Sequence, residues 1–593
     1  MPINPGMPAS EMDLQPRAVA LPGGFWHRQP ANWRDLVALV MIVGIILLLG
    51  SGASQMVAPI PAAQPQEISL SPGALPNDAL RTTMRMLAAM VASLVFTFTY
   101  GTAAAKSRRA EMVLIPLLDV LQSVPVLGYL SFTVVFFVSL FPNRVLGVEL
   151  AAIFAIFTSQ AWNMAFSFFQ ALRTIPYDLD EASRGFRLSA WQRFWRLEVP
   201  FAVPGLVWNM MMSMSGGWFF VVASEAIAVG DLHVELPGIG SYVAHAIADR
   251  NLAAVGWAIL AMTLTILIYD QLLFRPLVAW ADKFHYEQTA AAVAPKSWVA
   301  DLFRGAGVFH RLGESVGAMT QAVARARLSI GSVVPRRQRQ APMLPSYLVN
   351  IVWYATIALA IAYLGRLLLQ FAGAELSWTD VWQATRDGGI TLLRVAVLIV
   401  IATVIWVPVG VAIGLRPAVA EKVQPLVQFL AAFPANLLFP IAVYLIARFQ
   451  LAPAIWLSPL MILGTQWYIV FNVIAGASAF PTDFKEAAAT FRIGGWRWWR
   501  EVMLPGIFPY YVTGAITASG GAWNASIVSE AVSWGPTKLS GGGLGAYIAQ
   551  MTEAGDFARI ALGIAVMSVL VVGMNRLLWR PLYAYAERRT RLD

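Results

Sequence analysis

Two stretches of the chain repeat one another: IPYDLDEASRGFRLSAWQRFWRLEVPFAVP at residues 175–204 and FPTDFKEAAATFRIGGWRWWREVMLPGIFP at residues 480–509. The shared residues keep one offset of 305 positions, so neither stretch holds an insertion relative to the other. They are Pro176, Asp178, Glu181, Ala182, Phe186, Arg187, Trp191, Pro200 and Pro204, which recur as Pro481, Asp483, Glu486, Ala487, Phe491, Arg492, Trp496, Pro505 and Pro509. The chain therefore contains two copies of one unit.

The repeat extends far beyond these stretches. Downstream, Trp218, Ser224, Glu225 and Arg275 recur at the same offset as Trp523, Ser529, Glu530 and Arg580. Upstream the offset is 309, where Arg85, Pro116 and Pro125 match Arg394, Pro425 and Pro434. A register kept over more than a hundred residues is not a chance similarity, and the change of offset places a short insertion or deletion between the third and fourth spans.

The composition is that of a membrane protein. Of 593 residues, 58% are hydrophobic and 13% are charged, about half the charged fraction of a soluble protein. Many apolar runs are long enough to cross a hydrocarbon core of roughly 30 Å. The chain has no cysteine, and its five histidines are scattered. We therefore expect no disulfide, no thiolate chemistry and no metal site.

Twelve apolar segments are long enough to be spans, six in each copy. They lie near 34–56, 82–104, 113–141, 149–172, 203–229 and 253–275, and near 347–372, 388–415, 423–448, 454–478, 508–533 and 557–579. The sequence predicts an all-α polytopic membrane protein of about twelve transmembrane helices, arranged as two six-helix pseudo-repeats. Because each copy has an even number of spans, both have the same topology, with a pseudo-twofold axis along the membrane normal.

Positive charge sets the orientation. Lysine and arginine gather in the connections after spans 2, 4, 8 and 10, which share one side if both termini are cytoplasmic. This divides the chain into a cytoplasmic tail at 1–33, a first repeat at 34–275, a basic cytoplasmic linker at 276–345, a second repeat at 346–580 and a cytoplasmic tail at 581–593. The basic residues lie in short loops, which favours contact with membrane lipid and argues against nucleic acid. The polar start of the chain has no apolar segment typical of a signal peptide.

The string LSGG at 539–542 is also found in ATPases of the ABC type. In the first copy, however, the equivalent residues are VELP (234–237), and no such loop can be read there. The copies share only a glycine turn, made of Gly238, Gly240 and Tyr242 in one and Gly543, Gly545 and Tyr547 in the other. The orientation places this turn outside, and the chain lacks the Gly-Lys pair of a P-loop. We expect no ATP hydrolysis on this chain, and therefore no catalytic residue.

The loop between the fourth and fifth spans of each copy has a definite predicted structure. Asp178 and Asp483 are placed to cap a short amphipathic helix whose third residue is Glu181 or Glu486, a variant of the capping box. An aromatic stretch suited to the membrane interface follows, AWQRFW in one copy and GWRWW in the other. The same helix on the same face of both copies indicates a docking element.

Glu-Ala-Ala/Ser with proline at the twentieth position resembles the EAA loop in permease subunits of type I ABC importers. Within that family the chain is similar to the nitrate/sulfonate/taurine/bicarbonate group. The residues that carry this likeness are PLLDVLQSVPVLGYL (116–130), PLVQFLAAFPANLLFP (425–440), and WFFVVASE and WNASIVSE, each followed by the glycine turn. The resemblance covers spans 2–6 and 8–12, and it implies the type I importer transmembrane fold.

The resemblance also implies partners. The EAA loops would be coupling helices that dock into two ABC ATPase subunits, with ATP and magnesium on those subunits and no cofactor on this chain. The coupling residues would be Asp178, Glu181, Ala182, Arg187 and Pro200, with Asp483, Glu486, Ala487, Arg492 and Pro505. An external or periplasmic solute-binding protein is implied as well, as is a place in the bacterial cytoplasmic (inner) membrane.

One departure from the family pattern occurs twice. The seventh position of the loop is usually glycine, and here it is Arg187 and Arg492. Because glycine permits a tight or positive-φ turn, the departure predicts a different turn. The other interpretation is that these arginines meet acidic residues of the ATPase or lipid phosphate.

Several polar or aromatic residues within the spans are candidates for the pathway. Glu225 and Glu530 lie near the outer membrane face, where an ionisable group is costly. They could form a gate, or a scaffold hydrogen-bonded to other helices or to the glycine turn. Trp218 and Trp523 follow glycine-rich steps and are expected to line the pathway, with plain helix packing as the alternative. Further candidates are Ser224 and Ser529 and, more weakly, Asn524, Gln160, Asn163 and Gln466.

The sequence thus predicts the permease of an ATP-driven importer. The expected solute is a small anion of the nitrate/sulfonate/taurine/bicarbonate class. An alternative is a twelve-span, ion-coupled transporter of the major-facilitator type, with Glu225 and Glu530 as coupling groups. A third is a membrane scaffold that uses the same loops to recruit a partner without transport.

Overall fold

The computed structural model describes residues 33–56, 68–142, 144–229, 232–284, 297–304 and 376–590, with a few isolated positions between 355 and 366. Four predicted segments lie wholly or mostly outside the described residues. They are residues 1–32 of the first tail, most of the linker, most of the predicted span at 347–372, and residues 591–593 of the second tail. The proposed domain boundaries therefore stay predictions.

The first half is almost wholly helical. Its elements are α1 (Trp33–Met56), α2 (Leu75–Lys106), α3 (Arg108–Ser123), α4 (Val126–Leu140), α5 (Val145–Arg173), α6 (Tyr177–Gly185), α7 (Ala190–Arg193), the π-helix η1 (Phe194–Glu198), α8 (Val199–Glu225), β1 (Ala226–Val229), β2 (Leu232–Glu235), α9 (Ile239–Ala248), α10 (Leu252–Tyr269), η2 (Asp270–Phe274), α11 (Arg275–Ala281), η3 (Asp282–Phe284) and α12 (Trp298–Arg304).

The second half repeats this order. Its described elements are α15 (Trp378–Gly414), α16 (Pro417–Ala432), η4 (Ala435–Leu438), α17 (Phe439–Arg448), α18 (Pro453–Trp456), η5 (Ser458–Met461), α19 (Gln466–Ser478), α20 (Thr482–Thr490), α21 (Gly495–Trp498), the π-helix η6 (Trp499–Met503), α22 (Leu504–Ser529), β3 (Ala531–Trp534), β4 (Thr537–Ser540), α23 (Leu544–Ala554), α24 (Phe557–Met574), η7 (Asn575–Trp579) and α25 (Arg580–Thr590).

The described residues confirm an all-α polytopic fold but not a count of twelve spans. Six helices are long and apolar enough to cross a membrane, or up to nine if each bent pair counts as one span. Three predicted spans are bent pairs, with angles of 101° between α3 and α4, 78° within 417–448 and 42° within 453–478. The first two bends fall at Pro125 and Pro434, because proline cannot donate the backbone hydrogen bond that would continue the helix.

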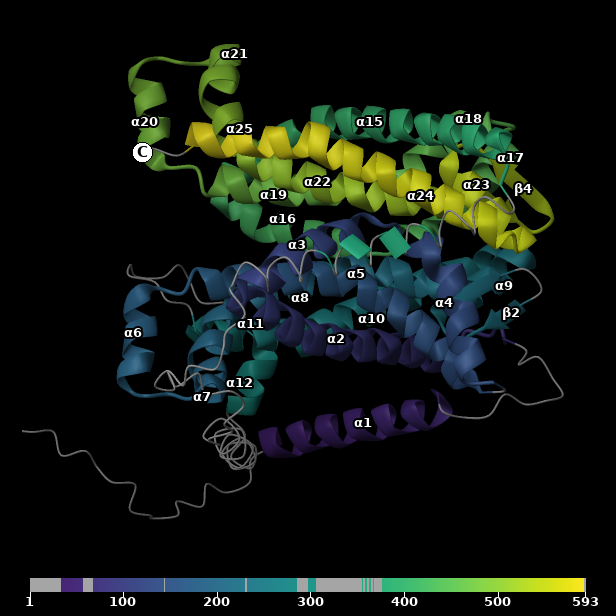
Figure 1. The fold of residues 1–593 in the computed structure, drawn as a ribbon, viewed down its shortest axis with the longest axis horizontal. Coiled ribbons are helices and arrows are strands. Elements are labelled where there is room, and N and C mark those ends of the chain that lie inside the picture. The colour runs from purple at the N-terminus through teal and green to yellow at the C-terminus, as the bar shows by residue number, and fades with distance from the viewer. Residues whose placement is uncertain are drawn as a thin grey trace, which may run out of the picture.

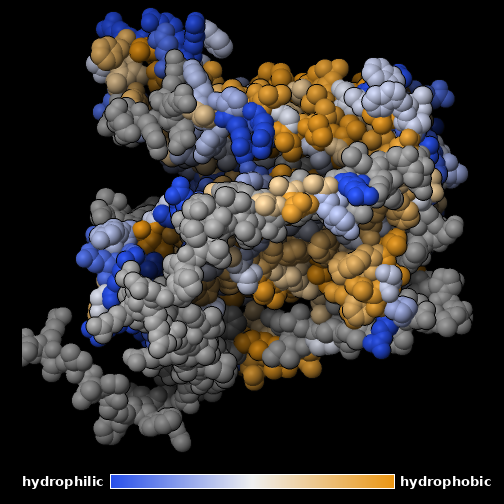
Figure 2. Space-filling view, viewed as in Figure 1, coloured by the Kyte–Doolittle hydropathy of each residue, from blue (hydrophilic) through white to orange (hydrophobic). Residues whose placement is uncertain are grey.

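The two halves lie side by side with the same elements at the same ends (Figure 1). Helices α6, α7, α20 and α21 project from one end, and β2, α9, β4 and α18 lie at the other. Figure 2 shows a broad apolar band between two polar ends, as expected of a protein surrounded by lipid. The two repeated loops therefore lie on one side, as a parallel repeat requires.

Each half is built on three packed helices, α2, α5 and α8 in the first and α15, α19 and α22 in the second. The equivalent glycines Gly101 and Gly410 allow this close packing. An added Cβ would come within 2.8 Å of Phe168 in one half and of Val473 in the other. Small residues at such contacts are typical of helix packing in membranes, where close approach replaces the hydrophobic effect as the driving force.

The end opposite the repeated loops carries two short antiparallel hairpins, which the span predictions missed. Helix α8 ends at Glu225, where β1 begins to pair with β2, and α22 ends at Ser529 before β3 pairs with β4. The predicted spans 203–229 and 508–533 are therefore too long at these ends. The second hairpin also reaches the first half, where the Gly535 amide donates to the Ile247 carbonyl at 2.9 Å.

Candidate functional site

The two repeated loops begin with the short helices α6 and α20, and each follows a proline. Pro176 and Pro481 are the N-cap residues, and neither helix has a side-chain cap hydrogen bond. The predicted capping boxes are therefore wrong, because the helices begin two residues earlier and Asp178 and Asp483 become their second residues. In the first turn of α6, Asp178 still interacts favourably with the helix dipole.

The turn after each helix keeps the geometry usually supplied by glycine. Arg187 and Arg492 adopt φ values of 50° and 53°. Just after α6, the Leu188 amide donates to the Ser183 carbonyl at 3.2 Å, and the Arg187 amide donates to the Arg184 carbonyl at 2.9 Å. The second loop has the same pair of bonds at equivalent residues, which is the Schellman pattern. The predicted change of turn is therefore wrong: the arginines accept a left-handed conformation instead.

The chain then returns to the membrane through equivalent elements. Ser189 and Gln192 form a capping box at the start of α7. A five-residue π-helix follows in each half, and Pro200 and Pro505 are the second residues of the long helices α8 and α22. A proline in the first turn of a helix sacrifices no intrahelical hydrogen bond. Each repeated loop is thus continuous with a central membrane helix.

The two loops expose matching side chains. Glu181 and Ala182 are exposed in α6, as are Glu486 and Ala487 in α20. The phenyl rings that follow are exposed to 80% for Phe186 and 76% for Phe491, and both left-handed arginines are exposed. Each loop exposes a further aromatic side chain, Tyr177 (76%) in the first and Trp496 (74%) in the second, and aromatic residues are enriched where a partner binds.

The first loop is tied to the membrane helices by charge. Asp180 of α6 pairs with Arg193 at 2.5 Å, and Arg193 pairs with the buried Glu198 at 3.2 Å. Glu198 also pairs with Lys106 at the end of α2, at 2.9 Å. These ion pairs link α6 to α2 through the start of α8.

Apolar groups occupy the equivalent positions of the second loop. The residues that replace Arg193, Glu198 and Lys106 are Trp498, Met503 and Leu415. All three belong to the hydrophobic core of the second half, and Met503 is fully buried. The two loops therefore share a backbone geometry and differ in what anchors it.

At the hairpin end of the first half, Glu225 lies in a buried ionic network. Its carboxylate accepts hydrogen bonds from Thr82 at 2.7 Å, from Arg85 at 2.7 Å and from the Gly240 amide at 2.7 Å. Arg85 also makes a two-pronged contact with Glu149, at 2.6 and 2.7 Å. Glu225 thus has the contacts of the predicted scaffold, reaching both a neighbouring helix and the glycine turn.

Glu530 has equivalent partners in the second half. It accepts from Thr391 at 2.9 Å, from Arg394 at 2.9 Å and from the Gly545 amide at 2.8 Å. No second carboxylate reaches Arg394 among the described residues. Its other contacts are the backbone carbonyls of Gly541, Gly542 and, at 3.3 Å, Ala454.

The predicted glycine turn packs directly against the glutamate of each network. A Cβ on Gly238 would lie 2.4 Å from the Glu225 carboxyl carbon, and one on Gly543 would lie 2.5 Å from Glu530. Gly240 and Gly545 meet the backbone of α8 and α22 in the same way. The Tyr242 hydroxyl donates to the Leu70 carbonyl at 2.8 Å, whereas that of Tyr547 is buried with no partner among the described residues.

Sequence analysis missed the partners of the two glutamates. Arg85 and Arg394 were noted only as markers of the repeat register, and Thr82, Thr391 and Glu149 were not noted at all. The signal was present, because an arginine inside an apolar span needs a nearby counter-charge. Each half offers the same pairing of an arginine with a glutamate.

The predicted pathway residues divide into two groups. Trp218 and Trp523 are 2% and 1% exposed and lie in the cores of the two halves, so helix packing describes them and neither borders a described cavity. Ser224 and Ser529 are buried as well. Asn524, in contrast, borders a cavity between the halves.

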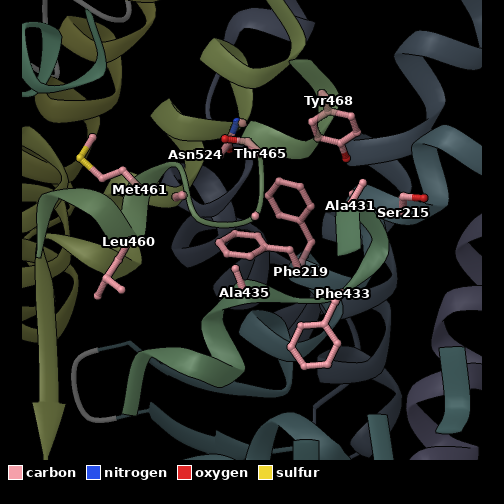
Figure 3. A pocket seen from close by; sticks show the side chains of 15 residues that line it. Ser215, Phe219, Ala431, Phe433, Ala435, Leu460, Met461, Thr465, Tyr468 and Asn524 are labelled. Atoms are coloured by element: carbon pink, nitrogen blue, oxygen red, sulfur yellow. The ribbon is translucent and has the colours of Figure 1, made fainter. Parts of the chain in front are cut away.

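That central cavity has a volume of about 70 Å³ (Figure 3). Its walls come from α8 of the first half and from α16, η4, η5, α19 and α22 of the second. They are Ser215, Gly216, Phe219, Phe220, Ala431, Phe433, Ala435, Leu460, Met461, Gly464, Thr465, Tyr468, Gly521, Asn524 and Ala525. The Asn524 carbonyl oxygen accepts from the Val126 amide at 2.8 Å, which holds the bend between α3 and α4.

The three weaker candidates lie outside this wall. Gln160 packs against Met86, its amide nitrogen 3.1 Å from the sulfur. Gln466 accepts from the Trp406 indole at 2.9 Å, and Asn163 accepts from Gln122 at 3.3 Å. None of the three borders the central cavity.

A larger cavity of about 570 Å³ lies toward the hairpins and is bordered by both halves. Its lining includes Val222 and Ala223 of α8 and the equivalent Ile527 and Val528 of α22. Toward the loops the halves meet instead: Trp208 of α8 stacks on Phe471 of α19 with 5.7 Å between ring centroids. The arrangement combines a larger cavity toward the hairpins, a small central cavity and an aromatic contact between the halves on the side of the loops.

Comparison with known proteins agrees with this architecture. The family described as "Binding-protein-dependent transport system inner membrane component" matches residues 96–274 and 405–592, together more than half the chain. The bicarbonate transport system permease protein CmpB of Synechococcus elongatus is 29% identical over 198 residues, 33% of this chain and 66% of that protein.

Two further relatives have other printed substrates. The nitrate import permease protein NrtB of Leptolyngbya laminosa is 26% identical over 200 residues, 34% of this chain and 66% of that protein. The glycine betaine/proline betaine permease protein ProW of Escherichia coli is 30% identical over 181 residues, 30% of this chain and 47% of that protein. The matches thus span just under two thirds of these relatives, or less. This chain belongs to the family of binding-protein-dependent ABC transport permeases, and it carries two fused copies of the family's domain.

Proposed function

We propose that this chain is the membrane subunit of an ATP-driven importer and that two ATPase subunits couple to it through α6 and α20. The observation that carries this proposal is the matched pair of exposed loops. Both present glutamate, alanine, phenylalanine and a left-handed arginine at one end of the molecule. Two equal docking surfaces suit two ATPase subunits. An external solute-binding protein would deliver the solute to the opposite end, which is the outer end in this proposal. The glycine turns and the 570 Å³ cavity, which we call the outer chamber, lie there.

Each loop continues along the chain into a helix that lines the central cavity. α6 leads through the turn at Arg187 into α7, η1 and α8, and α8 provides Phe219 and Phe220 to the central cavity. α20 leads in the same way into α22 and Asn524. A movement imposed on both loops by closing ATPases would therefore shift α8 against α22. It would also hold Trp208 against Phe471 and keep the inner side closed, whereas separation of the ATPases would release this contact and open the inner side.

The solute of this proposal is small and, by likeness to the bicarbonate and nitrate relatives, anionic. Import is proposed on the same ground. Neither the ion-coupled alternative nor the scaffold alternative gains support. Glu225 and Glu530, the candidate coupling groups, each face an arginine within 3 Å. Acids held by fixed cations are poorly suited to carrying protons through a transport cycle.

The test is co-purification of the ATPase with the chain from its native membranes in mild detergent. We expect two ATPase subunits per wild-type chain. The double variant Phe186→Ala/Phe491→Ala should weaken association at least tenfold and abolish uptake, because exposed aromatic anchors typically dominate such interfaces. Glu181→Arg with Glu486→Arg should act in the same direction.

The matched control is Trp378→Ala, which removes an aromatic side chain that is 84% exposed in the second half, at the start of α15. It should keep the full ATPase complement. If the ATPase stays bound at wild-type stoichiometry without Phe186 and Phe491, these loops are not the docking site. A chain that purifies alone under conditions that preserve other ABC complexes would contradict the proposed function as a whole.

A further inference from the structure

We propose that the two halves separate along only one of their two contacts when the inner side opens. The other contact, which holds the ion pair between Asp119 and Arg580, stays joined and serves as the pivot. The inference rests on the proposed function as an ATP-driven transporter, and it goes beyond that function by giving the two contacts different roles. Asp119 and Arg580 are positioning residues here, because they act through the arrangement of the halves.

The repeat creates two equivalent contacts between the halves, which we call seams. In one seam, α3 and α4 of the first half pack on α22 and α24 of the second. In the other, α16 and α17 of the second half pack on α8 and α10 of the first. Helices α3 and α16 both run along the boundary between the halves (Figure 1). Because the pseudo-twofold relation exchanges the two seams, they can be compared at equivalent positions.

The first seam is held by two directed polar contacts. On the loop side of the bend between α3 and α4, the Asp119 carboxylate pairs with the Arg580 guanidinium at the start of α25. At the bend itself, the Val126 amide donates to the Asn524 side-chain oxygen at 2.8 Å. Both contacts join a residue of the first half to a residue of the second. We call this contact the ionic seam.

The second seam, which we call the apolar seam, has neither contact at the equivalent positions. Gln428 corresponds to Asp119, and its amide nitrogen lies 2.8 Å from the sulfur of Met211. Phe219 corresponds to Asn524, and its side chain has no polar atom to offer. The charge and the amide oxygen that tie the ionic seam are thus replaced by a thioether contact and a phenyl ring.

The arginine at the end of the last long helix of each half differs in the same way. Arg580 reaches across the boundary, whereas the equivalent Arg275 pairs with Asp270 of its own helix at 3.3 Å. One hydrogen bond does cross the apolar seam, from the Asn436 side chain to the Phe219 carbonyl, but its length is 3.3 Å. The two seams therefore share their helices and differ in what holds them together.

The membrane makes this difference important. Lipid tails are as apolar as leucine, so an apolar contact between helices can be exchanged for lipid at little cost. A charged or hydrogen-bonded group that loses its partner within the membrane finds no water to replace it. The apolar seam therefore opens more readily. The stack of Trp208 on Phe471, which joins α8 to α19, opens with it.

The experiment measures both seams in the complex with the ATPase. Because the chain has no cysteine, spin labels can be placed at introduced cysteines. Labels at Leu117 and Leu577 span the ionic seam, and Leu426 and Leu272 are the equivalent positions at the apolar seam. Electron paramagnetic resonance gives each separation without nucleotide and with ATP, magnesium and vanadate. Between these states we expect the apolar seam to change by about 5 Å, the rise of one helical turn, and the ionic seam by no more than about 2 Å.

Three conservative variants test what holds the ionic seam. Arg580→Gln should release it, so that the separation of Leu117 and Leu577 then changes between the states as that of the other pair does. Asp119→Asn should have the same effect, and it decides if Arg580→Gln does not assemble. The matched control is Arg275→Gln, which removes the equivalent arginine. It should leave both separations as in the wild type, because the partner of Arg275 lies in the same helix.

Four results would overturn the inference. They are equal changes at both seams in the wild type, a larger change at the ionic seam, an apolar seam that does not move, and an ionic seam that stays fixed in Arg580→Gln and Asp119→Asn. The proposed function fails separately, through a wild-type chain that purifies without ATPase. That failure is seen before any separation is measured, so the two cannot be confused.

Discussion

The two repeated loops have the same backbone turn, but different interactions hold them to the membrane helices. In the first half, Asp180, Arg193, Glu198 and Lys106 form a series of ion pairs. In the second, the corresponding positions carry a lysine and three apolar residues, of which Met503 is fully buried. Ion pairs depend on partners, distance and salt, whereas apolar packing depends on shape and burial. One geometry can therefore be maintained by two kinds of interaction after a duplication.

The buried ionic networks around Glu225 and Glu530 differ in a related way. Arg85 is completely buried and faces two carboxylates, whereas the Arg394 side chain is 14% exposed and faces one carboxylate and several backbone carbonyls. Glu149, the additional carboxylate of the first half, corresponds to Ala454, whose carbonyl oxygen accepts from Arg394. In the second half, a backbone carbonyl thus contacts the arginine in place of the Glu149 carboxylate. The first half thus depends more on charge at both ends.

The largest expected effect comes from removing these arginines. Arg85→Met leaves Glu149 and Glu225 buried without a cation, and breaking a buried pair in this way typically costs about 3–5 kcal/mol. Arg394→Met leaves only Glu530, so its cost should be clearly smaller. Thermal unfolding of the detergent-purified variants, followed by size-exclusion chromatography, measures the difference.

A double variant sharpens this comparison. Arg85→Met/Glu149→Met leaves a single unpaired carboxylate, as Arg394→Met does, and should approach the stability of that variant. Equal unfolding midpoints for Arg85→Met and Arg394→Met would show that the second carboxylate has no energetic weight.

A smaller effect is expected at the loop anchors. Met503→Ala opens a cavity in a packed core, for which losses of about 2–5 kcal/mol are usual. Glu198→Gln keeps the volume and removes one charge, so we expect about 1 kcal/mol, since Lys106 is 42% exposed and well screened. Hydrogen exchange in 177–193 and 482–498 reports both changes locally.

Salt provides the control for these anchors. Raising the salt concentration from 0.05 to 0.5 M shortens the Debye length from about 14 Å to about 4 Å. Exchange should then accelerate in the first loop and not in the second. The comparison of anchors would be contradicted if both loops responded equally, or if the second loop responded more.

How far the sequence predicts this molecule depends on the kind of feature. The all-α membrane fold and the repeat are encoded locally, by apolar runs and by a constant register, and both predictions are confirmed, whereas the count of twelve spans is not. The bends at Pro125 and Pro434 were not, because proline inside an apolar run is compatible with a helix start, a kink or a turn. The first strand of each hairpin, after Glu225 and Ser529, was included in the predicted span because its residues are about as apolar as those of the helix.

The cavity wall shows a second limit. Trp218 and Phe219 are neighbours in sequence and lie about 100° apart around a helix, so only one of them can face the contact between the halves. Tertiary packing decides which, and it places the indole in the core and the phenyl ring at the cavity. The glycine-rich steps before Trp218 and Trp523 had favoured tryptophan instead.

The smallest expected effect concerns the left-handed arginines, and it distinguishes folding from docking. A non-glycine residue in this conformation costs roughly 1–2 kcal/mol, while glycine loses about 0.5–1 kcal/mol more chain entropy on folding. Arg187→Gly and Arg492→Gly should therefore stabilise their turns slightly, by about 0.5 kcal/mol each, seen as slower hydrogen exchange at 183–188 and 488–493. If the arginines serve only the turn, ATPase binding will be unchanged or improved. If binding weakens while exchange slows, the guanidinium groups contact the partner, and the strain is retained in both halves because docking requires it. Faster exchange in the glycine variants would contradict the strain itself, since the turns would then depend on the arginine side chains.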